Sequence, residues 1–226
     1  MKRLPHISRI EEMYELVDEI GFLPFFSCEM KGFSLMDITD YSLWWSFDPV
    51  LDPWEWRKKA AGDGRVAYGK FFKNRAGFIS KEWLPTFANF RRNGYDFDAL
   101  YDDGKATRRQ KLIMDMFAEP DTAIPSFELK KLAGFGGDGE KGYEGCITLL
   151  QMQTYLTVSD FQQKHNKHGE PYGWHVGVMS TMESCFGYDC VRSGYTEKPS
   201  ESLARIMERM SGFVEYGEKE MRGFLK

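Results

Sequence analysis

Two aspartates, each followed by proline, are side chains that could do acid–base chemistry. Asp48 and Asp52 stand before Pro49 and Pro53, and paired carboxylates can serve as general acid and general base. Aspartate before proline is also what a turn or a helix start requires, because its carboxylate accepts hydrogen bonds from the backbone N–H groups that follow. We favour the second interpretation, in which Asp52 caps a helix that runs from Pro53 to Gly62.

Metal and nucleotide chemistry have weaker signals in the chain. His165, His168 and His175 could ligate a metal together with a cysteine, but the first two lie on a predicted flexible tip. The four cysteines do not have the paired spacing of a zinc site. The glycines between positions 134 and 142 do not follow a strand with the spacing of a phosphate-binding loop. We therefore expect no metal and no cofactor.

Tryptophan is concentrated near the N-terminus and has two possible roles. Stacking against flipped bases is one of them, and filling a hydrophobic core is the simpler one. The residues in question are Trp44, Trp45, Trp54, Trp56 and Trp83.

The elements that would position a functional surface are clearest between Ser126 and Val178. Ser126 can N-cap a short helix that ends at a glycine cluster. A second helix, over residues 141–154, has one apolar face and one polar face. Two strands follow, at 155–160 and 172–178, and the polar tip Gln162–Glu170 separates them. Helix, turn, helix, strand, loop and strand is the order of a winged helix-turn-helix.

A winged helix suggests binding of duplex DNA, with the helix in the major groove and the hairpin beside the phosphates. The net charge is −4, so a DNA-binding protein of this composition must concentrate its cations locally. We expect base contacts from Lys141, Thr148 and Gln151, since amide side chains can pair with adenine edges. We expect phosphate contacts from Lys164, Lys167, Lys70, Lys73 and Arg75. Winged helices also bind proteins, so a protein-interaction module remains an alternative.

The first part of the chain repeats this order of elements in a degenerate form. An amphipathic helix over residues 7–20 ends at Gly21, and residues 65–80 form a hairpin whose turn is basic. Asn93-Gly94 is the candidate boundary, which gives a unit at 1–94 and a second at 95–226. The predicted fold class is α+β, mostly α, with two winged helix-turn-helix-like units and a C-terminal pair of helices.

Composition sets the expected environment. The sequence has no signal peptide and no apolar run of the roughly 18 residues that span a membrane, and its cysteines read as buried, reduced thiols. We expect a soluble cytoplasmic protein. The oligomeric state stays open.

Several segments also resemble the AlkZ-like family of winged-helix proteins, whose best-known members are DNA glycosylases that release alkylated or cross-linked bases. The segments are Tyr41–Trp45, Tyr68–Phe72 with the chain to Ile79, Trp83–Pro85, Phe127–Leu129, Leu149–Gln151 and Pro199–Met210.

The resemblance implies a catalytic signature that this chain does not carry in the expected place. In the family it is glutamine, an apolar residue, then glutamine or aspartate, just after the first helix. Here that stretch is Gly21-Phe22-Leu23-Pro24-Phe25-Phe26, which has no amide or carboxylate side chain to hold a hydrolytic water. Gln151-Met152-Gln153 has the right residue types but lies in the second unit. We therefore expect a DNA-binding protein without the catalytic residues, and keep a glycosylase that uses Gln151 and Gln153 as an alternative.

Overall fold

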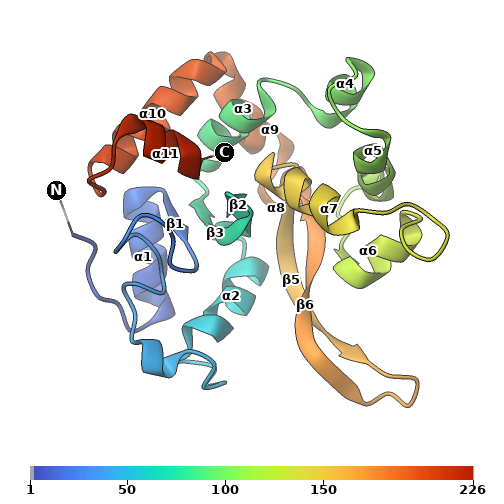
Figure 1. The fold of residues 1–226 in the computed structure, drawn as a ribbon, viewed down its shortest axis with the longest axis horizontal. Helices are drawn as coiled ribbons and strands as arrows, with labels where there is room; N and C mark the ends of the chain where they lie inside the picture. The colour runs from blue at the N-terminus through green and yellow to red at the C-terminus, as the bar shows by residue number, and fades with distance from the viewer. Residues whose placement is uncertain (1–2, 226) are drawn as a thin grey trace.

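The computed structural model describes residues 3–225 and shows a mixed α+β protein with more helix than strand (Figure 1). The N-terminal unit contains α1 (Ile10–Ile20), β1 (Phe22–Pro24), α2 (Pro53–Gly62), β2 (Val66–Phe72), β3 (Arg75–Ser80) and α3 (Leu84–Arg92). The central unit contains α4 (Phe97–Asp102), α5 (Arg108–Met114), β4 (Ile124–Pro125), α6 (Ser126–Leu132), α7 (Tyr143–Met152), β5 (Leu156–His165) and β6 (Pro171–Thr181). The C-terminal helices are α8 (Met182–Phe186), α9 (Tyr188–Arg192), α10 (Pro199–Ser211) and α11 (Glu218–Phe224).

The two sheets have the same topology. In the N-terminal unit, β3 lies between β1 and β2, and in the central unit β6 lies between β4 and β5, with every pair antiparallel. In each unit a short strand after the first helices therefore pairs with the last strand of the hairpin. The repeated element order of the sequence corresponds to a repeated strand order in space.

The hydrophobic core is divided between two clusters of buried side chains. One cluster joins the N-terminal unit to the C-terminal helices, and the other lies within the central unit. The rings of Phe72 in β2 and Phe224 in α11 stack with centroids 5.1 Å apart, and α10 lies beside α3 in Figure 1. The C-terminal helices thus pack against the N-terminal unit.

Local sequence signals set some of the helix ends. Gly21 has a φ of 93° and its backbone N–H bonds to the Val17 carbonyl, which ends α1 as predicted. The predicted N-cap at Ser126 is wrong, because Ser126 is the first residue of α6 and Pro125 holds the cap position. Ser126 instead connects α6 to α7, since its carbonyl accepts a bond of 2.8 Å from the Tyr143 hydroxyl.

The hairpin of the central unit is longer than the sequence predicts. The strand expected to end at Asp160 continues to His165, and the turn contains only residues 166–170. The extension is polar, but backbone pairing does not depend on side-chain polarity, and Lys164 pairs with Tyr172. In Figure 1 this hairpin projects away from the rest of the molecule.

Two further sequence expectations bear on cysteines and membranes. The four cysteines are unpaired thiols, and all are partly rather than fully buried. Within residues 3–225, no helix is both long enough and apolar enough to cross a membrane.

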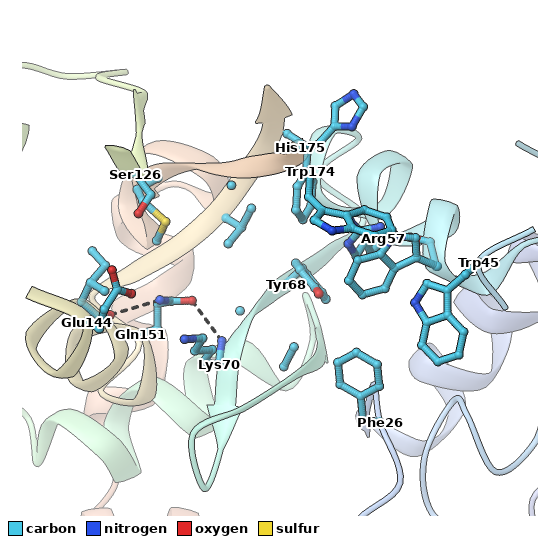
Figure 2. Close-up of a pocket in the computed structure, with 18 residues that line it drawn as sticks. Phe26, Trp45, Arg57, Tyr68, Lys70, Ser126, Glu144, Gln151, Trp174 and His175 are labelled. Atoms are coloured by element: carbon cyan, nitrogen blue, oxygen red, sulfur yellow. Dashed lines mark hydrogen bonds between the residues drawn. The ribbon is translucent and has the colours of Figure 1, made fainter. Parts of the chain in front are cut away.

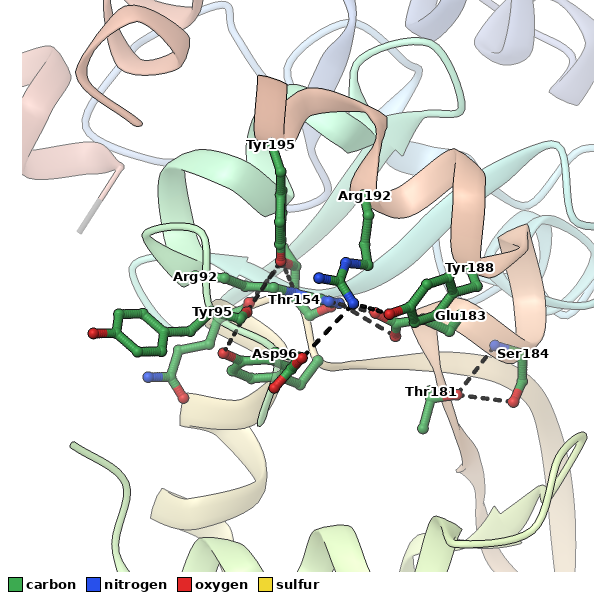
Figure 3. A network of polar contacts seen from close by, with 12 residues as sticks. Arg92, Tyr95, Asp96, Thr154, Thr181, Glu183, Ser184, Tyr188, Arg192 and Tyr195 are labelled. Carbon is green, nitrogen blue, oxygen red and sulfur yellow. Dashed lines mark hydrogen bonds and ion pairs between the residues drawn. The ribbon is translucent and has the colours of Figure 1, made fainter. Parts of the chain in front are cut away.

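Arg92, the last residue of α3, contacts both the central unit and the C-terminal helices. Its side chain is 1% exposed, donates to the Thr154 carbonyl at 2.5 Å and forms an ion pair with Glu183 of α8 (Figure 3). Its guanidinium also lies 4.5 Å from the centroid of the Tyr155 ring. One buried cation therefore contacts the end of α7, the start of β5 and α8, and each of these contacts crosses from the N-terminal unit.

Replacing Arg92 with methionine should destabilise the protein strongly. The change keeps much of the side-chain length but leaves Glu183 and the Thr154 carbonyl without their donor. Removing one partner of a buried ion pair costs about 3–5 kcal/mol, which urea unfolding would detect as a lower midpoint. As a control, R222M removes the exposed pair with Glu218 on α11 and should cost less than about 1 kcal/mol. An R92M protein with the wild-type midpoint would show that the junction does not need this cation.

Candidate functional site

A cleft of about 470 Å³ lies between the N-terminal and central units. Its lining comes from α2 and β2 on one side and from α6, α7, β5 and β6 on the other. Figure 2 shows that aromatic rings and Arg57 gather along one wall, whereas Ser126, Glu144 and Gln151 lie opposite them. Ligand pockets of proteins measure roughly 300–1,000 Å³, so the cleft has the size of a ligand site.

The aromatic wall is partly exposed. Trp45 is 38% exposed and Trp174, from β6, is 58% exposed. Trp174 stacks on Phe47 with centroids 5.8 Å apart and meets the edge of Trp54 at 6.0 Å. The tryptophans thus divide between two roles, because Trp44 and Trp56 are buried core residues while Trp45 and Trp54 line the cleft.

Asp52 fixes the backbone that carries the cleft tryptophans. It is fully buried, and its carboxylate accepts bonds from the backbone N–H groups of Trp54 at 2.8 Å, Trp45 at 3.2 Å and Phe47 at 2.9 Å. Asp48 likewise accepts from two backbone N–H groups, those of Val50 and Leu51. The turn and cap interpretation of these aspartates is confirmed, because Asp52 caps α2 and Asp48 accepts bonds from the backbone that follows it.

Arg57 is the central cation of the cleft. It is 3% exposed, and its guanidinium carbon lies 3.4 Å from the Trp54 ring centroid and 4.7 Å from that of Phe161 in β5. It donates to the Trp54 carbonyl and forms an ion pair with none of the described residues. Burial lowers the pKa of Arg57 from its ordinary value. A cation held between aromatic faces from both units helps to join them.

The polar wall comes from α7, and here the structure corrects the sequence analysis. Thr148 and Gln151 are 8% and 4% exposed, so the predicted readable face of this helix is not exposed at these positions. The Gln151 carbonyl oxygen accepts from the Lys70 backbone N–H at 3.1 Å, and the Lys70 ammonium donates to Thr148 at 3.3 Å. The polar face of α7 therefore packs on β2 of the other unit.

The two glutamines proposed as a displaced catalytic pair point to different neighbours. Gln151 lines the cleft, whereas the Gln153 carbonyl oxygen accepts a bond of 3.1 Å from the Gln110 amide in α5. Residues two apart on a helix do not share a face. Gln151 and Gln153 therefore form no common site in this structure.

The predicted phosphate-binding cations lie in separate places. Lys73 and Arg75, at the β2–β3 turn, both pair with the Glu29 carboxylate. These two bonds, together with one from Glu29's own backbone N–H, lower the pKa of that carboxyl to about 2. Lys164, in β5, lies 5.6 Å from the centroid of the Phe127 ring. Lys141 and Lys167 are exposed, before α7 and in the hairpin turn. The hairpin and α7 cations are thus free of carboxylates among the described residues, and the turn cations are not.

The three histidines do not gather. His165 ends β5 and His168 lies in the turn, whereas His175 lines the cleft. Desolvation and the nearby Lys58 lower the pKa of His175, so its imidazole is neutral at pH 7. Within residues 3–225, no three His, Cys, Asp or Glu side chains are placed to hold a metal ion.

Sequence reasoning missed Arg57, Phe161 and Trp174 as cleft residues. Trp174 could have been predicted as exposed, because it lies near the tip of a strand whose neighbouring residues are polar, where no hydrophobic core is expected. Arg57 had no such signal, since an arginine in a short helix with two lysines beside it predicts a solvated side chain. Its position follows from the contact of α2 with β5, which depends on the tertiary fold.

The fold and cleft define a mixed α+β protein with two three-stranded antiparallel sheets of the same strand order and an aromatic-lined cleft. Residues 7–226 match the family described as AlkZ related, so the chain belongs to that family. The resemblance seen in the sequence is thereby confirmed, and it associates the chain with DNA repair. No curated protein matches the chain, and no solved structure does.

Replacing Asp52 with asparagine should destabilise the loop that carries the cleft tryptophans. The amide has one acceptor oxygen, so its NH2 group would face a backbone N–H and leave a buried donor unpaired, at a cost of about 1–3 kcal/mol. We expect a lower urea midpoint and a red shift of tryptophan emission. The control D48N changes an aspartate with exposed surroundings and should alter both readouts less. Equal effects of the two changes would contradict the role assigned to Asp52.

Proposed function

We propose that this chain is a DNA-binding protein built from two winged-helix units, residues 1–94 and 95–226, with the C-terminal helices of the second packing back on the first. The shared strand order of the two sheets supports this division. Membership of the AlkZ-related family supports a role in handling damaged DNA or in its regulation. The free thiols suit a cytoplasmic location.

The observation that carries the proposal is the projecting β5–β6 hairpin beside α6 and α7. Lys164 and Lys167 lie at its far end, and the exposed Lys141 precedes α7. A hairpin with cations at its tip, next to a helix pair, is the arrangement by which winged helices contact phosphates and the major groove. Lys73 and Arg75 would add a weaker contact, because Glu29 already neutralises part of their charge.

Lys70, Thr148 and Gln151 have a different place in this proposal. All three lie at the contact between the units, so they cannot meet bases in an intact major groove. They would be reached only by a nucleic-acid group that enters the cleft.

Removing the two hairpin lysines should flatten the salt dependence of DNA binding. Each phosphate contact contributes a slope of about −0.9 in a plot of log affinity against log salt, so K164A/K167A should make the slope shallower by roughly 2. Fluorescence anisotropy with a labelled duplex at several salt concentrations measures this. The control K198A/K219A makes the same charge change just before α10 and on α11 and should alter the slope less. Absence of binding at low salt would favour a protein-interaction module instead.

A DNA glycosylase is the second candidate, because Gln151 and Glu144 line the cleft. A carboxylate and an amide in a cleft can position a water for attack on a glycosidic bond. The stretch that carries the catalytic side chains in the family, Gly21–Phe26 here, supplies only Phe26 to this cleft. The absence of a polar side chain there leads us to prefer the non-catalytic proposal.

Incubation with a duplex that contains an alkylated purine distinguishes the two candidates. The DNA-binding proposal expects no released base and no abasic site, as measured by chromatography. A glycosylase would release the base, and E144Q or Q151A would slow release by about 10²–10⁴-fold. Q153A is the matched control, since Gln153 bonds to Gln110 and should leave any release unchanged.

A further inference from the structure

The two walls of the cleft match the two recognisable features of a nucleobase. One wall presents the exposed rings of Trp45 and Trp174, and the facing wall presents the polar groups of Ser126, Glu144 and Gln151 (Figure 2). A base has flat π faces that stack on aromatic rings. It also has an edge of donors and acceptors that amides and carboxylates bind. The cleft therefore offers both kinds of contact across a single opening.

The polar wall retains hydrogen-bonding capacity. Gln151 uses one N–H for the Ile147 carbonyl and one lone pair for the Lys70 N–H, and an amide has two of each. Gly69 lies directly beside it, because a Cβ at that position would stand 3.3 Å from the Gln151 carbonyl oxygen. A side chain at position 69 would meet the Phe71 ring first, at 2.9 Å, and would also crowd this amide.

Arg57 brings a positively charged hydrogen-bond donor to the cleft. Its residue is 97% buried, since it is 3% exposed, and its hydrogen bond within the described chain goes to a carbonyl, not to a carboxylate. A guanidinium carries five N–H donors, so Arg57 has further donors for the acceptor edge of a purine.

The cleft is continuous with the proposed DNA-binding hairpin. Trp174 and the turn at residues 166–170 belong to the same hairpin, and Trp174 lies four residues beyond Glu170. At about 3.3 Å per residue, this separation is roughly 13 Å, or about four base-pair steps of DNA. DNA held by Lys164 and Lys167 would therefore have a nucleotide close to the mouth of the cleft.

We propose that the cleft between the two units binds one unpaired nucleobase of the DNA held by the hairpin. The base stacks on Trp174 and Trp45, its edge faces Gln151 and Glu144, and Arg57 donates to an acceptor of the same nucleotide. This inference rests on the DNA-binding function proposed above and names the class of DNA that is preferred: a duplex with a base that is already out of the stack, at a bulge, mismatch or lesion. Such a base has lost part of its stacking energy before it binds.

The test compares two labelled duplexes that differ only by one bulged adenine. Stacking of a single base on an aromatic side chain changes affinity by roughly 5- to 150-fold, so anisotropy should show binding of the bulged duplex at least about fivefold tighter. W174A should remove the preference, so that the bulged and the fully paired duplexes bind with equal affinity. Y188A is the matched control, because Tyr188 is also 58% exposed but lies on α9, outside the cleft. W45A removes the other exposed tryptophan of the cleft, which lies outside the hairpin, and should also remove the preference.

Each outcome decides between the two proposals. A preference that is lost in W174A and W45A and kept in Y188A supports the cleft as the base site. Equal affinity for the two duplexes overturns the inference while DNA binding stands. A preference that survives both tryptophan changes also overturns it. If neither duplex binds, the proposed function fails, and the inference fails with it.

Discussion

The buried contact of Arg92 with Thr154 and Glu183 is the constraint on which the arrangement of the units depends. The chain turns immediately after it, at Asn93 and Gly94, which have φ values of 52° and 77°, so the covalent link alone does not fix the angle between the units. Arg92 fixes it at one end, because a fully desolvated guanidinium requires all of its partners in place. At the other end, Arg57 lies between Trp54 and Phe161. Both arginine contacts cross the interface, and Arg57 itself lines the cleft.

This arrangement explains why the polar face of α7 is not free. An amphipathic pattern predicts which side of a helix is polar, but it does not tell whether that side meets water or another part of the chain. Thr148 and Gln151 meet β2, where Lys70 offers both a backbone N–H and an ammonium group. Their hydrogen bonds therefore join the units, and the surface proposed to bind DNA lies on the hairpin and at the start of α7 instead.

Helix caps and helix ends that depend on residues nearby in the sequence could be predicted from it. Strands and cleft residues that depend on contacts with distant segments could not. Asp52 caps α2 and Gly21 ends α1 through bonds within a few residues, and both were predictable. The strands β1 and β4 contain three and two residues, and each includes a proline, so neither has a periodicity to detect. They exist because β3 and β6 present free edges. The cleft was not predictable for the same reason, since Arg57, Gln151 and Trp174 come from three separate elements.

In the proposed function, the hairpin and the cleft make two contributions to the free energy of DNA binding, and these depend differently on salt concentration. Phosphate contacts release counterions and weaken as salt rises, whereas stacking of a base on tryptophan exchanges no ions. A duplex with an unpaired base and a perfect duplex present the same phosphates to Lys164 and Lys167, so the electrostatic term cancels in the ratio of their affinities. The net charge of −4 keeps this electrostatic contribution, which both duplexes share, small. Discrimination would then come from the cleft and persist at salt concentrations at which undamaged DNA is released.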